Sequence, residues 1–146
     1  LNGIAQGFIT DRIVTLLRVG GVMSTLADLG EIRALGARPD GTPWRVGLAG
    51  EAGALPLINR AVATSSAEGF RFAGPHSPGH ILDPRTGASA ARHASVSVIA
   101  PEAATADALS TAFSLMPSDQ IAQMLARLPD TEVRLVAPDG RRLVLT

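Results

Sequence analysis

Near the start of the chain, apolar residues recur at the three-to-four-residue spacing of a helix. Charged residues such as Asp11, Arg12 and Arg18 fall on other faces. Gly20 and Gly21 then interrupt the pattern, as glycine commonly does after a helix. The pattern predicts an amphipathic helix over residues 4–19, with an approximate apolar stripe made by Ile4, Phe8, Ile13, Leu16 and Leu17.

Short apolar runs separated by turn residues follow this helix. Gly30 separates the first run from the second, and Pro39-Asp40-Gly41 separates the second from the third. We therefore predict strands over residues 22–28, 32–38 and 44–48, joined as an antiparallel meander. Two further strands are predicted over residues 61–65 and 95–100, and the punctuation of residues 74–92 is typical of a loop.

The last third of the chain changes to helical spacing and then returns to alternation. It predicts helices over residues 102–116 and 118–128, the second with Ser118 as its N-cap. Residues 131–137 and 141–145 flank Pro138-Asp139-Gly140 and predict a closing hairpin. Strands before and after helices, without regular βαβ alternation, favour an α+β fold with an antiparallel sheet and packed helices.

The composition is that of an ordinary globular domain. A chain of 146 residues, 46% hydrophobic and 18% charged, can bury a core and is not of the disordered class. The 13 basic and 13 acidic residues balance, so no basic excess indicates a nucleic-acid partner or a polybasic membrane surface. The absence of cysteine excludes disulfides, a thiolate nucleophile and Cys-ligated metals.

One carboxylate and two hydroxyls, those of Asp107, Ser110 and Thr111, lie at helical spacing in residues 105–111, whose other residues are Ala, Leu and Thr105. Ser110 and Thr111 follow Asp107 by three and four residues, so a helix places the three side chains on one face. Oxygen ligands grouped in this way suit a hard cation such as Mg²⁺. The alternative is that Asp107 lies in a first helical turn and meets the helix dipole, and on these residues alone it is the stronger interpretation.

A candidate general base lies in the loop before the last pair of helices. His76 and His80 are four residues apart, but Pro78-Gly79 between them forbids the helix that a zinc pair would need. The imidazole of His80, beside a short apolar run and a tight turn, is a candidate general base. A loop histidine without a role is the alternative.

Two glycine-containing segments have a structural interpretation as well. In Asp83-Pro84-Arg85-Thr86-Gly87, Asp83 can cap a turn and Gly87 permits a positive φ. Gly3-Ile4-Ala5-Gln6-Gly7 begins the first predicted helix, where backbone N–H groups can hold a phosphate. This segment lacks the general phosphate-loop patterns, and close packing of two helices is the alternative.

Five segments follow one another along residues 1–116 in a specific order: Leu1-Asn2-Gly3-Ile4-Ala5-Gln6-Gly7-Phe8 with Asp11-Arg12, residues 28–36, Ala63-Thr64-Ser65-Ser66, residues 80–87 and residues 105–112. In this order they resemble the FAD:protein FMN transferases, the ApbE family. The single glycine of Asp28-Leu29-Gly30-Glu31, with Gly69-Phe70-Arg71-Phe72, is most similar to the NosX-type branch linked to nitrous oxide respiration.

The resemblance implies an enzyme that moves FMN from FAD onto a Thr or Ser hydroxyl of a target flavoprotein. The product is a phosphoester and AMP is released. Mg²⁺ is the implied cofactor, FAD the substrate and an acceptor flavoprotein the partner, in a T-fold-like domain. The implied location is outside the cytoplasm, either periplasmic or membrane-anchored. The chemistry is coherent, because phosphoryl transfer needs neutralised charge on the pyrophosphate and a nucleophile in line.

The same resemblance assigns roles to individual residues. It implies two catalytic residues, Asp107 and His80, and His80 takes the proton from the incoming hydroxyl. The metal ligands are Asp107, Ser110, Thr111 and the backbone carbonyl of Ala5. The residues that line FAD are Asn2, Gln6, Phe8, His80 and Ile81.

The resemblance also bounds the domain. It makes residues 1–146 the C-terminal portion of a single ApbE-like flavin transferase domain, whose N-terminal part supplies other FAD contacts. The chain starts at Leu1 without Met or a signal peptide. We therefore expect a missing N-terminal segment, or a homo-oligomer, to cover the apolar residues of the first helix.

Two departures from the family pattern leave other functions open. Gln6 stands where many members have Lys, which removes a cationic contact to phosphate, and Phe8 stands where Tyr is usual. These departures favour a non-catalytic FAD-binding or partner-binding module, a flavoprotein maturation factor that retains the fold. Intact His80 and Asp107 favour the enzyme. A third alternative is a structural piece that pairs with another chain.

Overall fold

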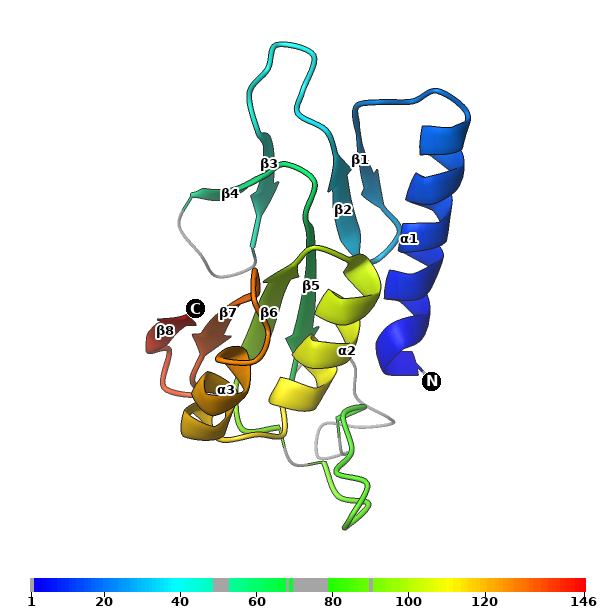
Figure 1. Ribbon diagram of the computed structural model, residues 1–146. Coiled ribbons are helices and arrows are strands. Elements are labelled where there is room, and N and C mark those ends of the chain that lie inside the picture. Colours follow the sequence, from blue (N-terminus) through cyan, green and yellow to red (C-terminus); the bar gives the residue numbers. More distant parts are fainter. Residues whose placement is uncertain (1, 49–52, 68, 70–78, 90) are drawn as a thin grey trace. The chain divides into compact units, whose positions relative to one another are not determined.

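The computed structural model describes residues 2–48, 53–67, 69, 79–89 and 91–146 (Figure 1). The chain forms two compact units, each considered by itself below. The first unit contains residues 1–63 and 99–108, and the second contains residues 64–98 and 109–146. His76, for which the sequence excludes a helical zinc pair with His80, lies outside the described residues.

The first unit packs a long helix against antiparallel strands. Helix α1 (Asn2–Val19) confirms the predicted first helix and packs against β1 (Thr25–Asp28) and β2 (Ile32–Leu35). Strand β2 pairs antiparallel with β1 and, on its other edge, with β5 (Ala61–Ser66). The order in this unit is therefore β1-β2-β5. The helix α2 (Ala103–Phe113) begins in the same unit.

The predicted meander is wrong at its third strand. Strand β3 (Trp44–Gly47) pairs with β4 (Ala54–Leu57) in a separate two-stranded sheet. The edge of β2 that a meander would give to β3 is occupied by β5, where Ile32 lies opposite Val62. The sequence did not predict β4, because it is short and contains Pro56, a residue unfavourable inside strands.

A compact apolar core holds the strands of the first unit together. Its buried residues come from β2 to β6, so both sheets contribute side chains to one core. Burying such side chains stabilises a fold by about 1.5–3 kcal/mol each. The core residues are Ala34, Val46, Leu48, Leu55, Leu57, Val62 and Ile99, with Leu26, Ile32 and Trp44 packed against them.

The second unit combines strands with the end of α2 and the helix α3 (Ser118–Leu125). The strand order is β5-β6-β7-β8, with β6 at Ser95–Ala100, β7 at Glu132–Val136 and β8 at Arg142–Leu145. The predicted closing hairpin is confirmed, since β7 and β8 pair antiparallel with Val133 opposite Leu145. The fully buried side chains of this unit include Val96, Phe113, Ile121 and Val133.

Two helix details differ from the sequence prediction. Pro117, and not Ser118, is the N-cap of α3, and no side chain caps that end. Proline fits at the start of a helix because it has no backbone N–H, and N–H groups there have no intrahelical acceptor. Helix α2 is shorter than predicted and begins at Ala103. The α+β fold class with antiparallel strands and packed helices is confirmed. Within the described part of the chain, every helix is too short or too polar to cross a membrane.

Candidate active site

The carboxylate of Asp107 reaches from α2 to the first turns of α1. The backbone N–H of Gly7 donates to Oδ2 of Asp107 over 3.0 Å, and the aspartate is 5% exposed. A Cβ on Gly7 would lie 2.3 Å from the carbonyl oxygen of Ala103, so only glycine allows α1 and α2 to approach this closely. The packing interpretation of the glycine-containing segment is confirmed at Gly7.

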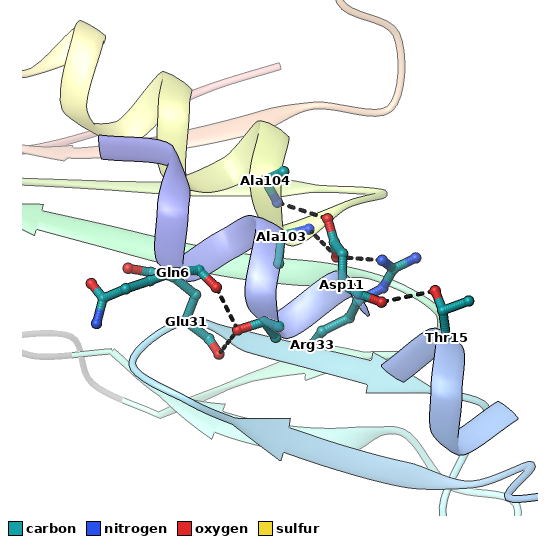
Figure 2. A network of polar contacts seen from close by, with 8 residues as sticks. Gln6, Asp11, Thr15, Glu31, Arg33, Ala103 and Ala104 are labelled. Carbon is teal, nitrogen blue, oxygen red and sulfur yellow. Dashed lines mark hydrogen bonds and ion pairs between the residues drawn. The ribbon is translucent and has the colours of Figure 1, made fainter. Parts of the chain in front are cut away.

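The helix-dipole interpretation of Asp107 is wrong. Helix α2 has no acidic residue in its first turn, and Asp107 is the fifth residue of the helix. Asp11 of α1 meets this helix end instead, because Ala103 and Ala104 both donate their backbone N–H groups to its carboxylate over 2.9 Å (Figure 2). The negative charge at the N-terminus of α2, the role that the sequence suggested for Asp107, is therefore supplied by Asp11 of α1. This leaves Asp107 without that structural explanation for its position.

In the second unit, Ser65 at the end of β5 joins the two predicted hydroxyl ligands. The Oγ of Ser65 lies 2.9 Å from Oγ of Ser110 and 3.4 Å from Oγ1 of Thr111. Ser110 is 1% exposed. Sequence reasoning placed Ser65 in a family segment and gave it no role. The available signal was the change from apolar to small polar residues at the end of β5.

His80 lies near the same end of β5. Its Cε1 is 3.5 Å from where a Cβ of Gly69 would stand, and the carbonyl oxygen of Ser66 is 3.4 Å from that point. The residue His80 is exposed, whereas Ile81 beside it is 6% exposed. Within this unit, the fold thus brings three family segments to one strand end: the end of β5, the His80 loop and the second half of α2.

The turn after His80 is built as the sequence predicts. The backbone N–H of Arg85 donates to Oδ1 of Asp83 over 2.9 Å, and Gly87 adopts a φ of 69°. The hydrogen bonds from the side chain and backbone of Arg85, helped by its charge, lower the pKa of Asp83 to about 2. Leu82 and Ser89 form an isolated antiparallel bridge that closes the loop.

The predicted FAD-lining residues of α1 are exposed where their side chains are described. Phe8 is 57% exposed, and Gln6 is exposed as well. The side-chain Nε2 of Gln6 lies 2.6 Å from where a Cβ of Gly30 would stand, so this glycine, with its φ of 102°, makes room for the amide. Asn2 begins α1, and its side chain lies outside the described residues.

The predicted residues divide between the two units. The first unit holds Asn2, Ala5, Gln6, Phe8 and Asp107, and the second holds His80, Ile81, Ser110 and Thr111. Ser110 and Thr111 follow Asp107 along the same helix by three and four residues, as the sequence predicted. The segment that suggested the NosX-type branch includes residues 70–72, which lie outside the described residues. That assignment stays a prediction.

The donor chemistry decides which metal these residues could hold. Among the described residues, no group of three or more His, Asp or Glu side chains is placed to hold a metal ion. The predicted set is of a different kind: one buried carboxylate, two hydroxyls and a backbone carbonyl. Mg²⁺ is typically bound by one or two carboxylates, with water and substrate phosphates completing its shell. The oxygen-only set with one carboxylate therefore fits Mg²⁺.

Comparison with known proteins agrees with these features. Two curated relatives are called FAD:protein FMN transferase. The one from Treponema pallidum is 34% identical, with 97% of this chain and 44% of the relative covered, and the one from Haemophilus influenzae is 32% identical, with 82% and 38% covered. The chain thus spans less than half the length of these relatives.

A solved structure and a family profile extend the likeness. The ApbE protein of Thermotoga maritima matches with a TM-score of 0.85 and 28% identity, over 98% of this chain and 50% of that one. The profile described as the ApbE family matches residues 1–135. Because this match covers nearly the whole chain, including all five segments, the chain belongs to the ApbE family.

Proposed function

We propose that the full-length protein is an FAD:protein FMN transferase. It would move FMN from FAD onto a Thr or Ser hydroxyl of an acceptor flavoprotein and release AMP. The names of the relatives support this activity. The single observation that carries it is Asp107, a buried carboxylate held by the Gly7 N–H at the first turns of α1, with Ser110 and Thr111 following on the same helix.

We propose Asp107, Ser110, Thr111 and the backbone carbonyl of Ala5 as the residues that would hold Mg²⁺. When bound, the ion would neutralise negative charge on the pyrophosphate. The burial of Asp107 and its fixed contact with Gly7 support its role, because ligands act best when their position is set in advance. The contacts of Ser65 with Ser110 and Thr111 would orient both hydroxyls.

In this proposal His80 takes the proton of the acceptor hydroxyl. The hydroxyl oxygen forms a bond to the phosphorus of the FMN half of FAD, the bond from that phosphorus to the bridging oxygen breaks, and AMP leaves with that oxygen. The exposure of His80 supports the role, because a hydroxyl on another protein must reach it.

Asn2, Gln6, Phe8, His80 and Ile81 would line FAD. The exposure of Gln6 and Phe8 leaves them accessible to a ligand, whereas Ile81 would contribute mainly through its backbone, since its side chain is buried. A location outside the cytoplasm also stays a proposal, and the family resemblance is its support. Fractionation of cells that express the full-length protein with its acceptor would test it.

The function is tested with the full-length protein, FAD, Mg²⁺ and an acceptor flavoprotein. AMP is measured by chromatography, and covalent FMN by the mass of the acceptor and of an acceptor variant with the target Thr changed to Val. We expect AMP and labelled acceptor in equal amounts, loss of both in EDTA, and loss of both in Asp107→Asn. Asp119→Asn is the matched control, because Asp119 is an exposed carboxylate on α3.

A second candidate, a non-catalytic FAD-binding module, is favoured by one observation. The amide of Gln6, at the position where many family members have Lys, packs over the backbone of Gly30 and brings no positive charge. This module would bind FAD without releasing AMP under any concentration of Mg²⁺. FAD binding without AMP release would therefore replace the transferase by the module, and absence of both would reject the two functions together.

A further inference from the structure

The carboxylate of Asp11 connects three groups in the first unit. Its two oxygens accept the backbone N–H groups of Ala103 and Ala104, and Oδ1 also forms an ion pair with the guanidinium of Arg33 on β2 (Figure 2). The side chain of Asp11 is 15% exposed. The contacts therefore attach the start of α2 to α1 and, through Arg33, to the sheet of this unit.

The two helices exchange carboxylate contacts in a regular way. Gly7 and Asp11 are four residues apart on α1, and Ala103 and Asp107 are four residues apart on α2. Asp11 accepts from Ala103, while Asp107 accepts from Gly7. Residues four apart lie on one face of a helix, so the two contacts are one turn apart on each helix. Two such points fix both the rotation of α2 about its axis and its position along α1.

We infer that Asp11 is a positioning residue for the Asp107 carboxylate. It acts through α2 and touches neither substrate nor metal. If the contact of Asp11 with Ala103 and Ala104 is lost, α2 loses one of the two contacts that fix its rotation against α1, and the carboxylate of Asp107 shifts with the helix. This inference rests on the proposed function, in which Asp107 is a ligand of Mg²⁺.

The test compares Asp11→Asn, Asp11→Glu and Arg33→Gln in the full-length protein, with Asp119→Asn as control. Mn²⁺, used in place of Mg²⁺, is titrated and its free fraction followed by electron paramagnetic resonance, a readout independent of turnover. Groups that orient metal ligands typically change metal affinity about 10- to 100-fold when removed. We expect Asp11→Asn to weaken Mn²⁺ binding about 10-fold and to raise the half-saturating Mg²⁺ for AMP release by the same factor, with the rate at saturating Mg²⁺ retained.

The remaining variants keep the inference open to contradiction. Asp11→Glu keeps the charge on a longer side chain, so this variant is expected to fold but to bind Mn²⁺ more weakly. Arg33→Gln leaves the hydrogen bonds of Asp11 to α2 in place, so it is expected to change Mn²⁺ binding less. Asp11 is a purely structural residue if both of its variants melt at a lower temperature yet bind Mn²⁺ within two-fold of the parent. If Asp107→Asn also leaves Mn²⁺ binding unchanged, the proposed function fails; if it abolishes binding while the Asp11 variants do not, only this inference fails.

Discussion

Oδ2 of Asp107 and the backbone nitrogen of Gly7 are 3.0 Å apart, although 100 residues separate them in the sequence. The hydrogen bond between them holds a buried carboxylate against the first turns of another helix. It gives Asp107 two separable roles, because the same side chain contributes to the packing of α1 on α2 and, in the proposed function, to the binding of a metal ion.

Substitutions of Asp107 are expected to separate these two roles. Asp107→Ala leaves the Gly7 N–H without this acceptor, and a buried unsatisfied donor costs about 1–3 kcal/mol. Asp107→Asn retains an oxygen acceptor and removes the charge. It is therefore expected to lose less stability than Asp107→Ala, and to lose the dependence of activity on the metal ion completely. Chemical denaturation without metal measures the first effect, with Asp119→Ala as control. Equal stability of Asp107→Ala and the control would mean that the Gly7 contact contributes nothing.

Gly7→Ala is expected to destabilise the protein by about 1–3 kcal/mol, as overpacking of close-packed interiors does. The added methyl would lie 2.3 Å from the carbonyl oxygen of Ala103, and a backbone atom cannot move aside as a flexible side chain can. Gly47→Ala is the matched control, because among the described residues, apart from Gly47 and its chain neighbours, no atom lies within 4 Å of the corresponding Cβ position. Urea denaturation of both variants checks the difference. A Gly7→Ala midpoint equal to that of Gly47→Ala would contradict the close approach of the two helices.

The elements that the sequence predicts well are those fixed by local pattern. Helix α1, strand β6 and the hairpin of β7 and β8 each lie within one segment, and the structure confirms them as elements. The apolar stripe predicted for α1 is wrong: Ile4, Phe8, Ile13 and Leu16 are exposed, because the face of the helix that is buried carries Thr10 and Val14. The partner of β3 depends on which strand occupies the edge of β2, a competition between segments far apart in the sequence. No local pattern describes that competition, so the meander was predicted wrongly.

The candidate site shows the same limit. The spacing of Asp107, Ser110 and Thr111 was visible because it lies within one helix. Asp11 acts on α2 across 92 residues, and Ser65 meets Ser110 across 45 residues. The change from apolar to small polar residues marks the end of β5 but does not tell which residue Ser65 meets. Asp11 has no signal in residue type or spacing, because a carboxylate on a surface helix is common. Their roles are visible only once the fold is known.

Ser65→Ala is expected to disturb both hydroxyls that it contacts. Loss of the hydrogen bond with Ser110 is expected to cost about 0.5–1.5 kcal/mol of stability, and Thr111 loses an orienting partner. In the full-length enzyme, the half-saturating Mg²⁺ concentration is therefore expected to rise. Ser89→Ala is the control, since Ser89 is exposed. Unchanged Mg²⁺ dependence, with stability lowered, would limit Ser65 to a structural role.

The stability that the Asp83 turn contributes is expected to change with pH only below pH 3.8. Since the pKa of Asp83 is lowered from 3.8 to about 2 in the folded chain, its contribution to stability is fully present above pH 3.8. The contribution is lost as the pH falls from 3.8 to about 2. The backbone amide of Arg85 donates to Asp83, so its nuclear magnetic resonance shift reports the titration. A midpoint near 3.8 would show that Arg85 does not hold the carboxylate, and Asp83→Asn should abolish the transition.

His80→Ala is expected to slow transfer of FMN to the acceptor about 10²- to 10⁴-fold, the usual contribution of a general base. FAD binding, measured by calorimetry, is expected to change much less, because other residues would also line the flavin. The matched control is His93→Ala, since Nε2 of His93 is hydrogen-bonded to the carbonyl of Met116 and lies outside the proposed site. Added imidazole should restore part of the lost rate if His80 accepts the proton. A variant that binds FAD poorly but transfers bound FMN at the parent rate would make His80 a binding residue instead, because a missing base cannot leave the chemical step unchanged.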